Sequence, residues 1–206
     1  MIGNLVRKVK YGDPYLKASD SKIIIIHIPK TGGNALANAL WGRQDIGHWR
    51  AYDFYKTNPK KFYELKKYAV LRDPISRLLS AYNFLKNGGR SLKDKKYIDK
   101  VGFNNFSFDD LLEHLYSSRN INLEHIHFRT QSSFLYIDGS LAVDYLIDYE
   151  MFGSDVCRFF GVDVFNDLKV INKTESKEEI LLSDLQLKKI KKIYKDDYEL
   201  YETLKK

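Results

Sequence analysis

Residues 27–34, HIPKTGGN, combine residue types that suit an anion site. Gly32 and Gly33 expose backbone N–H groups, and the dipole of a helix that begins there attracts negative charge. Lys30 adds a cation beside those N–H groups. A Walker A loop places its lysine after the glycines, whereas Lys30 precedes them. The segment therefore predicts a phosphate or sulfate site that differs from an ATPase loop.

A second pattern that suits a phosphate follows at 71–82, LRDPISRLLSAY. Arg72 comes at the end of a short apolar segment, where its guanidinium can bind a phosphate through two N–H groups. Ser80 lies in the helical pattern that follows. Eight residues of helix rise about 12 Å, so a long arginine side chain is needed if Arg72 and Ser80 are to reach one phosphate. Alone, this pattern would more simply be an arginine and a serine on a solvated helix, but together with residues 27–34 it predicts a second anion subsite.

Both motifs need a strand, a turn and a helix to hold them. Residues 22–28 are β-branched and almost wholly apolar, which predicts a central strand of a parallel sheet covered on both faces. Residues 68–71 predict a second buried strand, and Asp73 with Pro74 is typical of a helix start. Each motif thus follows the carboxyl end of a strand, where such sheets bind their ligands.

The rest of the chain continues this alternation. We expect a helix over 107–118, a strand over 143–147 and a helix over 154–160. Ser183 and Gln186 form a capping box ahead of one long C-terminal helix. Strands that alternate with helices predict an α/β fold with a mainly parallel sheet.

The composition limits the class of protein. The 206 residues are 44% hydrophobic and show no repeat or linker, so we expect one domain over 1–206, with 1–20 as an N-terminal extension. No signal-peptide pattern and no run of about 20 apolar residues occurs, so a cytoplasmic protein without a membrane span is expected. The single cysteine, Cys157, cannot form a disulfide within the chain, and its apolar neighbours predict a buried, inert thiol.

The net charge of +7 favours an anionic partner without identifying it. The lysine-rich stretch at 188–192 predicts a solvated helix face. One alternative function is a nucleotide-dependent phosphoryl transferase, although the chain lacks a Walker lysine and an acidic Mg²⁺ motif after a strand. Another is a non-catalytic protein that binds nucleic acid or an anionic glycan through its charge.

The two motifs together resemble those of a known family. Residues 27–34 are similar to the 5′-phosphosulfate loop of carbohydrate sulfotransferases, the Golgi heparan and chondroitin enzymes and their bacterial relatives. Residues 71–82 are similar to that family's 3′-phosphate motif, R-D-P-x-x-R-x-x-S-x-Y. The resemblance implies a P-loop-like three-layer fold and 3′-phosphoadenosine 5′-phosphosulfate (PAPS) as sulfuryl donor. It also implies a hydroxylated acceptor, expected to be a glycan, and neither a metal nor a nucleic-acid partner.

Residues 172–177, NKTESK, resemble the K-T-x-x-K stretch that closes over the nucleotide in heparan sulfate 2-O-sulfotransferases. A polar loop before the last helix is the other interpretation. Asn34 stands where the family more often has serine or threonine, but an amide can still donate to an anion. The resemblance as a whole implies these donor-binding residues: Lys30, Thr31, Gly32, Gly33, Asn34, Arg72, Ser80, Thr174 and Lys177.

Sulfuryl transfer needs a base for the acceptor proton and positive charge on the leaving phosphate. Lys30 suits the second role. His48 lies between the two motifs, where the uronyl 2-O-sulfotransferases carry their catalytic histidine, and we predict it as the base. We expect His27 and His114 to be structural.

Residues 124–131, EHIHFRTQ, resemble the His-Phe/Trp-x-Pro-Gln segment on the acceptor side of that family, with threonine in place of proline. The resemblance implies that His127, Arg129 and Gln131 bind the acceptor. The alternating histidines also fit a strand with one polar face or a pair of metal ligands. Because the sequence shows no third Cys or clustered acidic ligand beside them, no metal is predicted.

Overall fold

The computed structural model describes residues 13–20, 22–43, 45–161 and 181–205. The chain forms two compact units. Unit 1 comprises Met1–Arg72 and Gln131–Ile171, and unit 2 comprises Asp73–Thr130 and Asn172–Lys206. The single domain inferred from the sequence stays a prediction. Within the described residues, no helix has both the length and the apolar character needed to cross a membrane.

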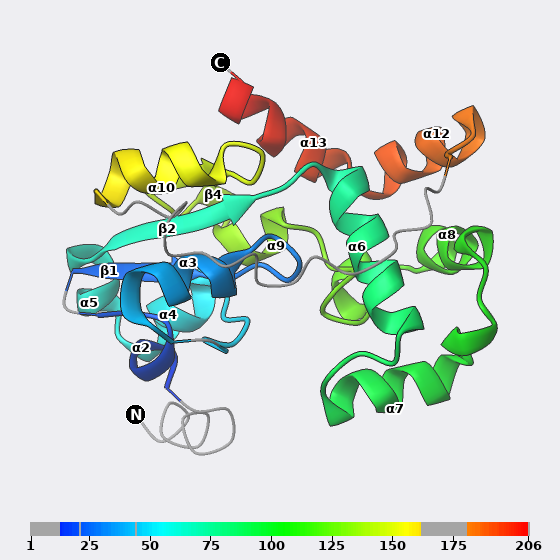
Figure 1. The fold of residues 1–206 in the computed structure, drawn as a ribbon, viewed down its shortest axis with the longest axis horizontal. Coiled ribbons are helices and arrows are strands. Elements are labelled where there is room, and N and C mark those ends of the chain that lie inside the picture. Colours follow the sequence, from blue (N-terminus) through cyan, green and yellow to red (C-terminus); the bar gives the residue numbers. More distant parts are fainter. Residues whose placement is uncertain (1–12, 21, 44, 162–180, 206) are drawn as a thin grey trace. The chain divides into compact units, whose positions relative to one another are not determined.

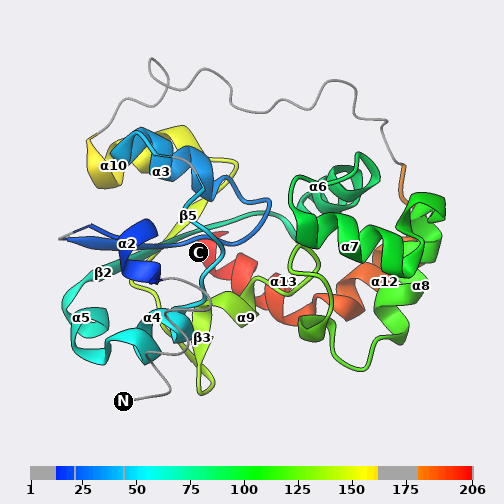
Figure 2. The same ribbon diagram turned by 90° about the horizontal axis from the view of Figure 1, so that it is seen from below.

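Unit 1 is built on a parallel sheet of three strands in the order β1-β2-β5. Its main strands are β1 (Ile23–Ile26), β2 (Lys66–Leu71) and β5 (Tyr145–Asp148). Its helices are α2 (Pro14–Lys17), α3 (Gly33–Trp41), α4 (Ala51–Thr57), α5 (Pro59–Glu64), α9 (Ser132–Leu135) and α10 (Phe152–Phe160), and β3 (Tyr136–Ile137) pairs with β4 (Ser140–Leu141). Figure 2 shows α3 and α10 on one side of the sheet and α4 and α5 on the other. The predicted α/β class, with a parallel sheet between helices, is confirmed.

The prediction that residues 22–28 form a central strand is wrong in one respect. Among the described strands, β2 lies in the middle and β1 at the edge, where a single antiparallel bridge joins Ser19 to Ile24. Ile24, Ile25 and Ile26 are nonetheless fully buried, since helices cover both faces of the sheet. Burial on both faces, rather than a central position, explains the continuous apolar run.

Unit 2 is helical. It contains α6 (Pro74–Lys86), α7 (Leu92–Val101), α8 (Phe108–Ser117), α12 (Asp184–Ile193) and α13 (Lys195–Glu202), with short 3₁₀ turns at Phe103–Asn105, Ile121–Leu123 and Thr203–Lys205 (Figure 1). Its core joins the apolar faces of α6, α8 and α12, with Phe103 and Phe128 fully buried among them. Ser107 and Ser183 cap α8 and α12 through capping boxes, as their sequences predict.

Two further predictions are wrong. The expected long C-terminal helix divides at Tyr194, which ends α12 and precedes α13. The Tyr194 ring is buried and its hydroxyl donates to the carbonyl of Phe128 at 2.8 Å, so a tertiary contact holds the break. Cys157 is exposed, because α10 turns Val156 rather than its neighbour toward the core.

Candidate functional site

The turn between β1 and α3 has the backbone conformation of an anion loop. Lys30 and Gly32 adopt left-handed conformations, with φ of 68° and 85°. Such a conformation is costly for a lysine and is found mainly where a loop must hold a particular shape. The helix α3 starts at Gly33, and the first N–H groups of any helix lack partners within it. These N–H groups and the positive end of the helix dipole can bind an anion.

Gly33 is required by the packing of His27. A Cβ atom built on Gly33 would lie 2.2 Å from Cδ2 of His27, far inside van der Waals contact. His27 follows β1 directly and is 5% exposed. The absence of a side chain at Gly33 therefore lets α3 begin directly against the end of the strand, as the motif requires.

Thr31 and Asn34 differ in whether their side chains can still form a hydrogen bond with a ligand. Thr31 is fully buried and its hydroxyl donates to the carbonyl of Ile28 at 3.0 Å, so the side chain closes the turn. Oδ1 of Asn34 is buried and accepts no hydrogen bond from the described residues. An unsatisfied buried acceptor costs about 1–3 kcal/mol. A rotation of the Asn34 amide by 180° occupies the same volume and would place its nitrogen, a donor for an anion, at this position.

Arg72 is held beside this loop at the carboxyl end of β2. Its guanidinium Nη1 donates to the carbonyl of Lys30 at 3.2 Å, and its Cζ lies 4.4 Å from the centre of the Tyr149 ring. The side chain is mostly buried, and its Nε has no hydrogen-bond partner among the described residues. Arg72 thus keeps its Nε–H group for an anion while its other contacts fix the guanidinium.

Tyr149 was not anticipated from the sequence. Its ring lies against Gly32, where an added Cβ would be 3.3 Å from Cε2, and it also lies below the Arg72 guanidinium. Tyr149 directly follows β5, and its backbone N–H donates to the carbonyl of Leu71 at 2.8 Å. In the sequence, a tyrosine after a strand cannot be told apart from an ordinary core residue. Only the pairing of β5 with β2 shows that Tyr149 lies beside Gly32 and Arg72.

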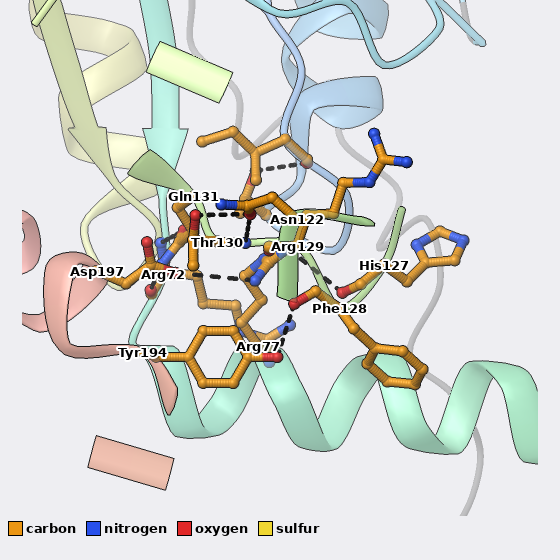
Figure 3. Close-up of polar contacts among 12 residues, drawn as sticks. Arg72, Arg77, Asn122, His127, Phe128, Arg129, Thr130, Gln131, Tyr194 and Asp197 are labelled. Carbon is orange, nitrogen blue, oxygen red and sulfur yellow. Dashed lines mark hydrogen bonds and ion pairs between the residues drawn. The ribbon is translucent and has the colours of Figure 1, made fainter. Parts of the chain in front are cut away.

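Gln131 lies against the backbone of Arg72 in unit 1. Its Oε1 accepts the N–H of Arg72 at 3.1 Å and its Nε2 donates to the Arg72 carbonyl at 2.8 Å (Figure 3). The side chain is fully buried. These contacts continue the hydrogen bonding of β2 past its end and orient Arg72; acceptor binding by Gln131 stays a prediction.

His48 and His27 form a pair of tilted rings in contact between β1 and α4. Their ring centres lie 4.3 Å apart. Nδ1 of His48 is 3.2 Å from the carbonyl of His27, and Nδ1 of His27 is 3.1 Å from the carbonyl of Gly47. Because a carbonyl only accepts, each ring carries a proton on Nδ1, and each neutral ring has an unprotonated Nε2. His48 is the more exposed of the two, which suits a base that must reach an acceptor.

Unit 2 contains residues 73–82, the second half of the segment predicted to bind a 3′-phosphate. Ser80 lies half-buried on α6. Arg77 of the same motif is almost fully buried, and its Nη2 donates to the carbonyls of His127 and Arg129 at 3.3 and 2.7 Å (Figure 3). Its Nη1 lies 4.0 Å from the buried carboxylate of Asp197. The motif arginine at Arg77 therefore holds the segment that precedes Gln131.

The predicted acceptor segment is a turn rather than a strand. The N–H of Phe128 donates to the carbonyl of His125 at 2.8 Å. His127 is 7% exposed, whereas Arg129 is half-buried and donates from Nε to the carbonyl of Glu124 at 3.1 Å. The charged side chain of Arg129 is thus more accessible to solvent than the side chain of His127.

The histidines of this turn contact Asp94 of α7. Nε2 of His125 and Nε2 of His127 lie 3.2 and 3.6 Å from Oδ1 of Asp94. Burial raises the pKa of Asp94, but hydrogen bonds from His127, Ser91 and Arg90 outweigh it and hold that pKa well below its usual range. Burial lowers the pKa of His125 and favours its neutral ring. Thr174 and Lys177 lie outside the described residues.

Residues 13–202 match the model of the sulfotransferase family. The chain belongs to the sulfotransferase family. Enzymes of this family transfer sulfuryl groups, so the loop of β1 and α3 is the candidate site of a transferase. No curated protein and no solved structure matches this sulfotransferase chain.

Proposed function

We propose that this sulfotransferase moves a sulfuryl group from PAPS to a hydroxyl of a glycan. The observation that supports the proposal best is that unit 1 contains two sets of hydrogen-bond donors that can bind anions. The N-terminus of α3 presents its N–H groups behind Lys30, and Arg72 keeps an unpartnered, buried Nε beside the same loop. PAPS carries a phosphosulfate and a separate 3′-phosphate, and therefore calls for two anion subsites.

The residues present fit PAPS as a substrate. Lys30, Gly32, Gly33 and Asn34 would bind the 5′-phosphosulfate, with Thr31 closing the turn, and Arg72 the 3′-phosphate. The motif assigns Ser80 to the 3′-phosphate as well, and the resemblance assigns Thr174 and Lys177 to the nucleotide. His127, Arg129 and Gln131 remain the candidates for the acceptor, and the half-buried charge of Arg129 makes it the strongest of these.

In the proposed reaction, Nε2 of His48 takes the proton of the acceptor hydroxyl. The oxygen attacks sulfur as the bond from sulfur to the phosphate oxygen breaks, and 3′-phosphoadenosine 5′-phosphate (PAP) leaves. Lys30 and the N–H groups of the loop stabilise the charge that develops on the leaving phosphate. The proton on Nδ1 of His48, donated to the His27 carbonyl, keeps Nε2 in the basic form.

A transfer assay tests this function. The chain is incubated with PAPS carrying labelled sulfur and with desulfated heparan and chondroitin backbones. We expect label in a glycan with the wild-type chain and a large loss of turnover in Lys30→Ala. Lys17→Ala, an exposed lysine on α2, is the matched control and should retain activity. Equal turnover in Lys30→Ala and Lys17→Ala would contradict the role of the loop.

A further inference from the structure

The turn at His125–Phe128 and the helix α7 bring together three side chains that the proposed reaction does not use as a set. Asp94, His125 and His127 each offer one ligand atom, and these atoms all lie within 4.8 Å of one another. The sequence could not show this group, because Asp94 lies far upstream of the two histidines. The expectation of no metal came from the family resemblance and from the lack of a third ligand beside the two histidines in the sequence.

The two distances from Asp94 match the coordination of a small divalent ion. Ligands at about 2.0–2.2 Å from a tetrahedral ion lie about 3.3–3.6 Å from one another. Oδ1 of Asp94 lies 3.2 Å from Nε2 of His125 and 3.6 Å from Nε2 of His127. Both separations from Asp94 therefore already fit such an ion, and the ligand atoms of the two histidines lie within 4.8 Å of each other.

The surroundings orient these ligands. Oδ2 of Asp94 accepts the N–H groups of Arg90 and Ser91 at 2.9 and 2.8 Å, so Oδ1 is directed toward the histidines. The backbone of His127 is held by Arg77 (Figure 3). Contacts of this kind around the ligands raise metal affinity because they fix ligand orientation in advance.

Aromatic rings pack against the two histidines of this group. The Tyr97 ring lies 4.6 Å from that of His125, and the Phe84 ring meets His127 edge-on at 4.7 Å, measured between ring centres. The side chains of Asp94 and His125 are only 6% and 8% exposed. An enclosed site with three protein ligands leaves one position for a water molecule.

We propose that Asp94, His125 and His127 form a binding site for a divalent transition-metal ion of the Zn²⁺ class, which joins α7 to the turn at residues 125–128. Two imidazoles and one carboxylate suit Zn²⁺, whereas Ca²⁺ and Mg²⁺ need a shell of oxygen ligands. The site lies within unit 2 and does not depend on the proposed sulfuryl transfer.

Zinc titration of the full chain tests the site. The chain, produced without a histidine tag, is stripped with a chelator and titrated with Zn²⁺ in competition with a chromophoric chelator at neutral pH. We expect one equivalent to bind. His125→Gln should weaken binding at least about 100-fold, since loss of a ligand costs more than the 10–100-fold that follows loss of a supporting contact.

His114→Gln is the matched control. His114 also pairs with a carboxylate, that of Glu124 at 3.2 Å, but the described residues supply no third ligand there. This variant should bind Zn²⁺ as the wild type does. Zn²⁺ should also raise the Tm of the wild type and not that of His125→Gln, so an intrinsic loss of stability in the variant does not obscure the result.

Less than one equivalent bound by the wild type would overturn the proposal. Equal zinc affinity in the wild type and in His125→Gln would do the same. Neither result would affect the binding of PAPS, which uses other residues.

Discussion

At the scale of single residues, the His27–His48 pair gives two chemically similar rings different surroundings. Both donate from Nδ1 to a carbonyl, but His27 is packed against Gly33 while His48 keeps more exposure. Only a ring that an acceptor can reach serves as a general base. The difference in packing thus favours His48 as the base and His27 as a structural residue.

Replacement of His48 by alanine tests this difference. A positioned general base contributes about 10²–10⁴-fold to rate, so kcat should fall by that factor in His48→Ala. Binding of PAP, measured by calorimetry, should stay near the wild-type value because the loop and Arg72 are unchanged. His114→Ala, in unit 2, is the control and should keep its kcat. Unchanged turnover in His48→Ala would remove this residue from the mechanism.

Asp20 offers a test by pH. Its Oδ1 accepts the N–H groups of Lys22 and Ile23 at 2.7 and 2.8 Å, and Oδ2 accepts Nε1 of Trp41 at 3.0 Å. Burial raises the pKa of Asp20, but these hydrogen bonds and the charge of Lys22 outweigh burial and hold the pKa below its usual range. A depressed folded pKa gives stability that is present above the unfolded pKa of about 3.9 and is lost as the pH falls through the folded pKa.

As the pH decreases below about 4, we therefore expect the free energy of unfolding to decrease less steeply in Asp20→Asn than in the wild type. Chemical denaturation at several pH values measures this. Fluorescence in a Trp49→Phe background reports on Trp41 as the remaining indole. Parallel pH profiles for the two proteins would show that Asp20 has no such linkage.

At the scale of elements, the start of α3 depends on a close approach between a helix and a strand. Gly33→Ala places a methyl group 2.2 Å from Cδ2 of the His27 ring, and overpacking of this kind costs about 1–3 kcal/mol. We expect a loss of stability of that size, measured by denaturant unfolding, together with weaker PAP binding. In a His27→Ala background the methyl group meets no ring, so the same substitution should cost little. An equal cost in both backgrounds would contradict the steric explanation.

The elements that the sequence predicted well depend on local patterns. The helices α6 and α8, with their Asp73 and Ser107 caps, follow from spacing and capping residues. Sheet order, the break at Tyr194 and the exposure of Cys157 depend on contacts with distant segments, and no local pattern contains them. The alternating histidines at 125 and 127 suggested a strand, yet Asp94 and Arg77 hold them in a turn.

At the scale of the whole molecule, the match to the sulfotransferase family over residues 13–202 covers both units. The loop residues and Arg72 could be predicted from the sequence because their order along the chain is the motif itself. Tyr149 could not, and Gln131 was predicted for the acceptor rather than for the support of Arg72, since only the folded chain brings them to Gly32 and to the backbone of Arg72.

The central claim is that the chain distinguishes a 3′-phosphorylated nucleotide, and calorimetry with PAP and ATP tests it most directly. ATP has no 3′-phosphate for Arg72, and the loop lacks the lysine placement of an ATPase. We expect PAP to bind at least about ten-fold more tightly than ATP, a difference of about 1.4 kcal/mol. Arg72→Met should reduce that preference more than Lys17→Met does. Equal or tighter binding of ATP by the wild-type chain would contradict the account.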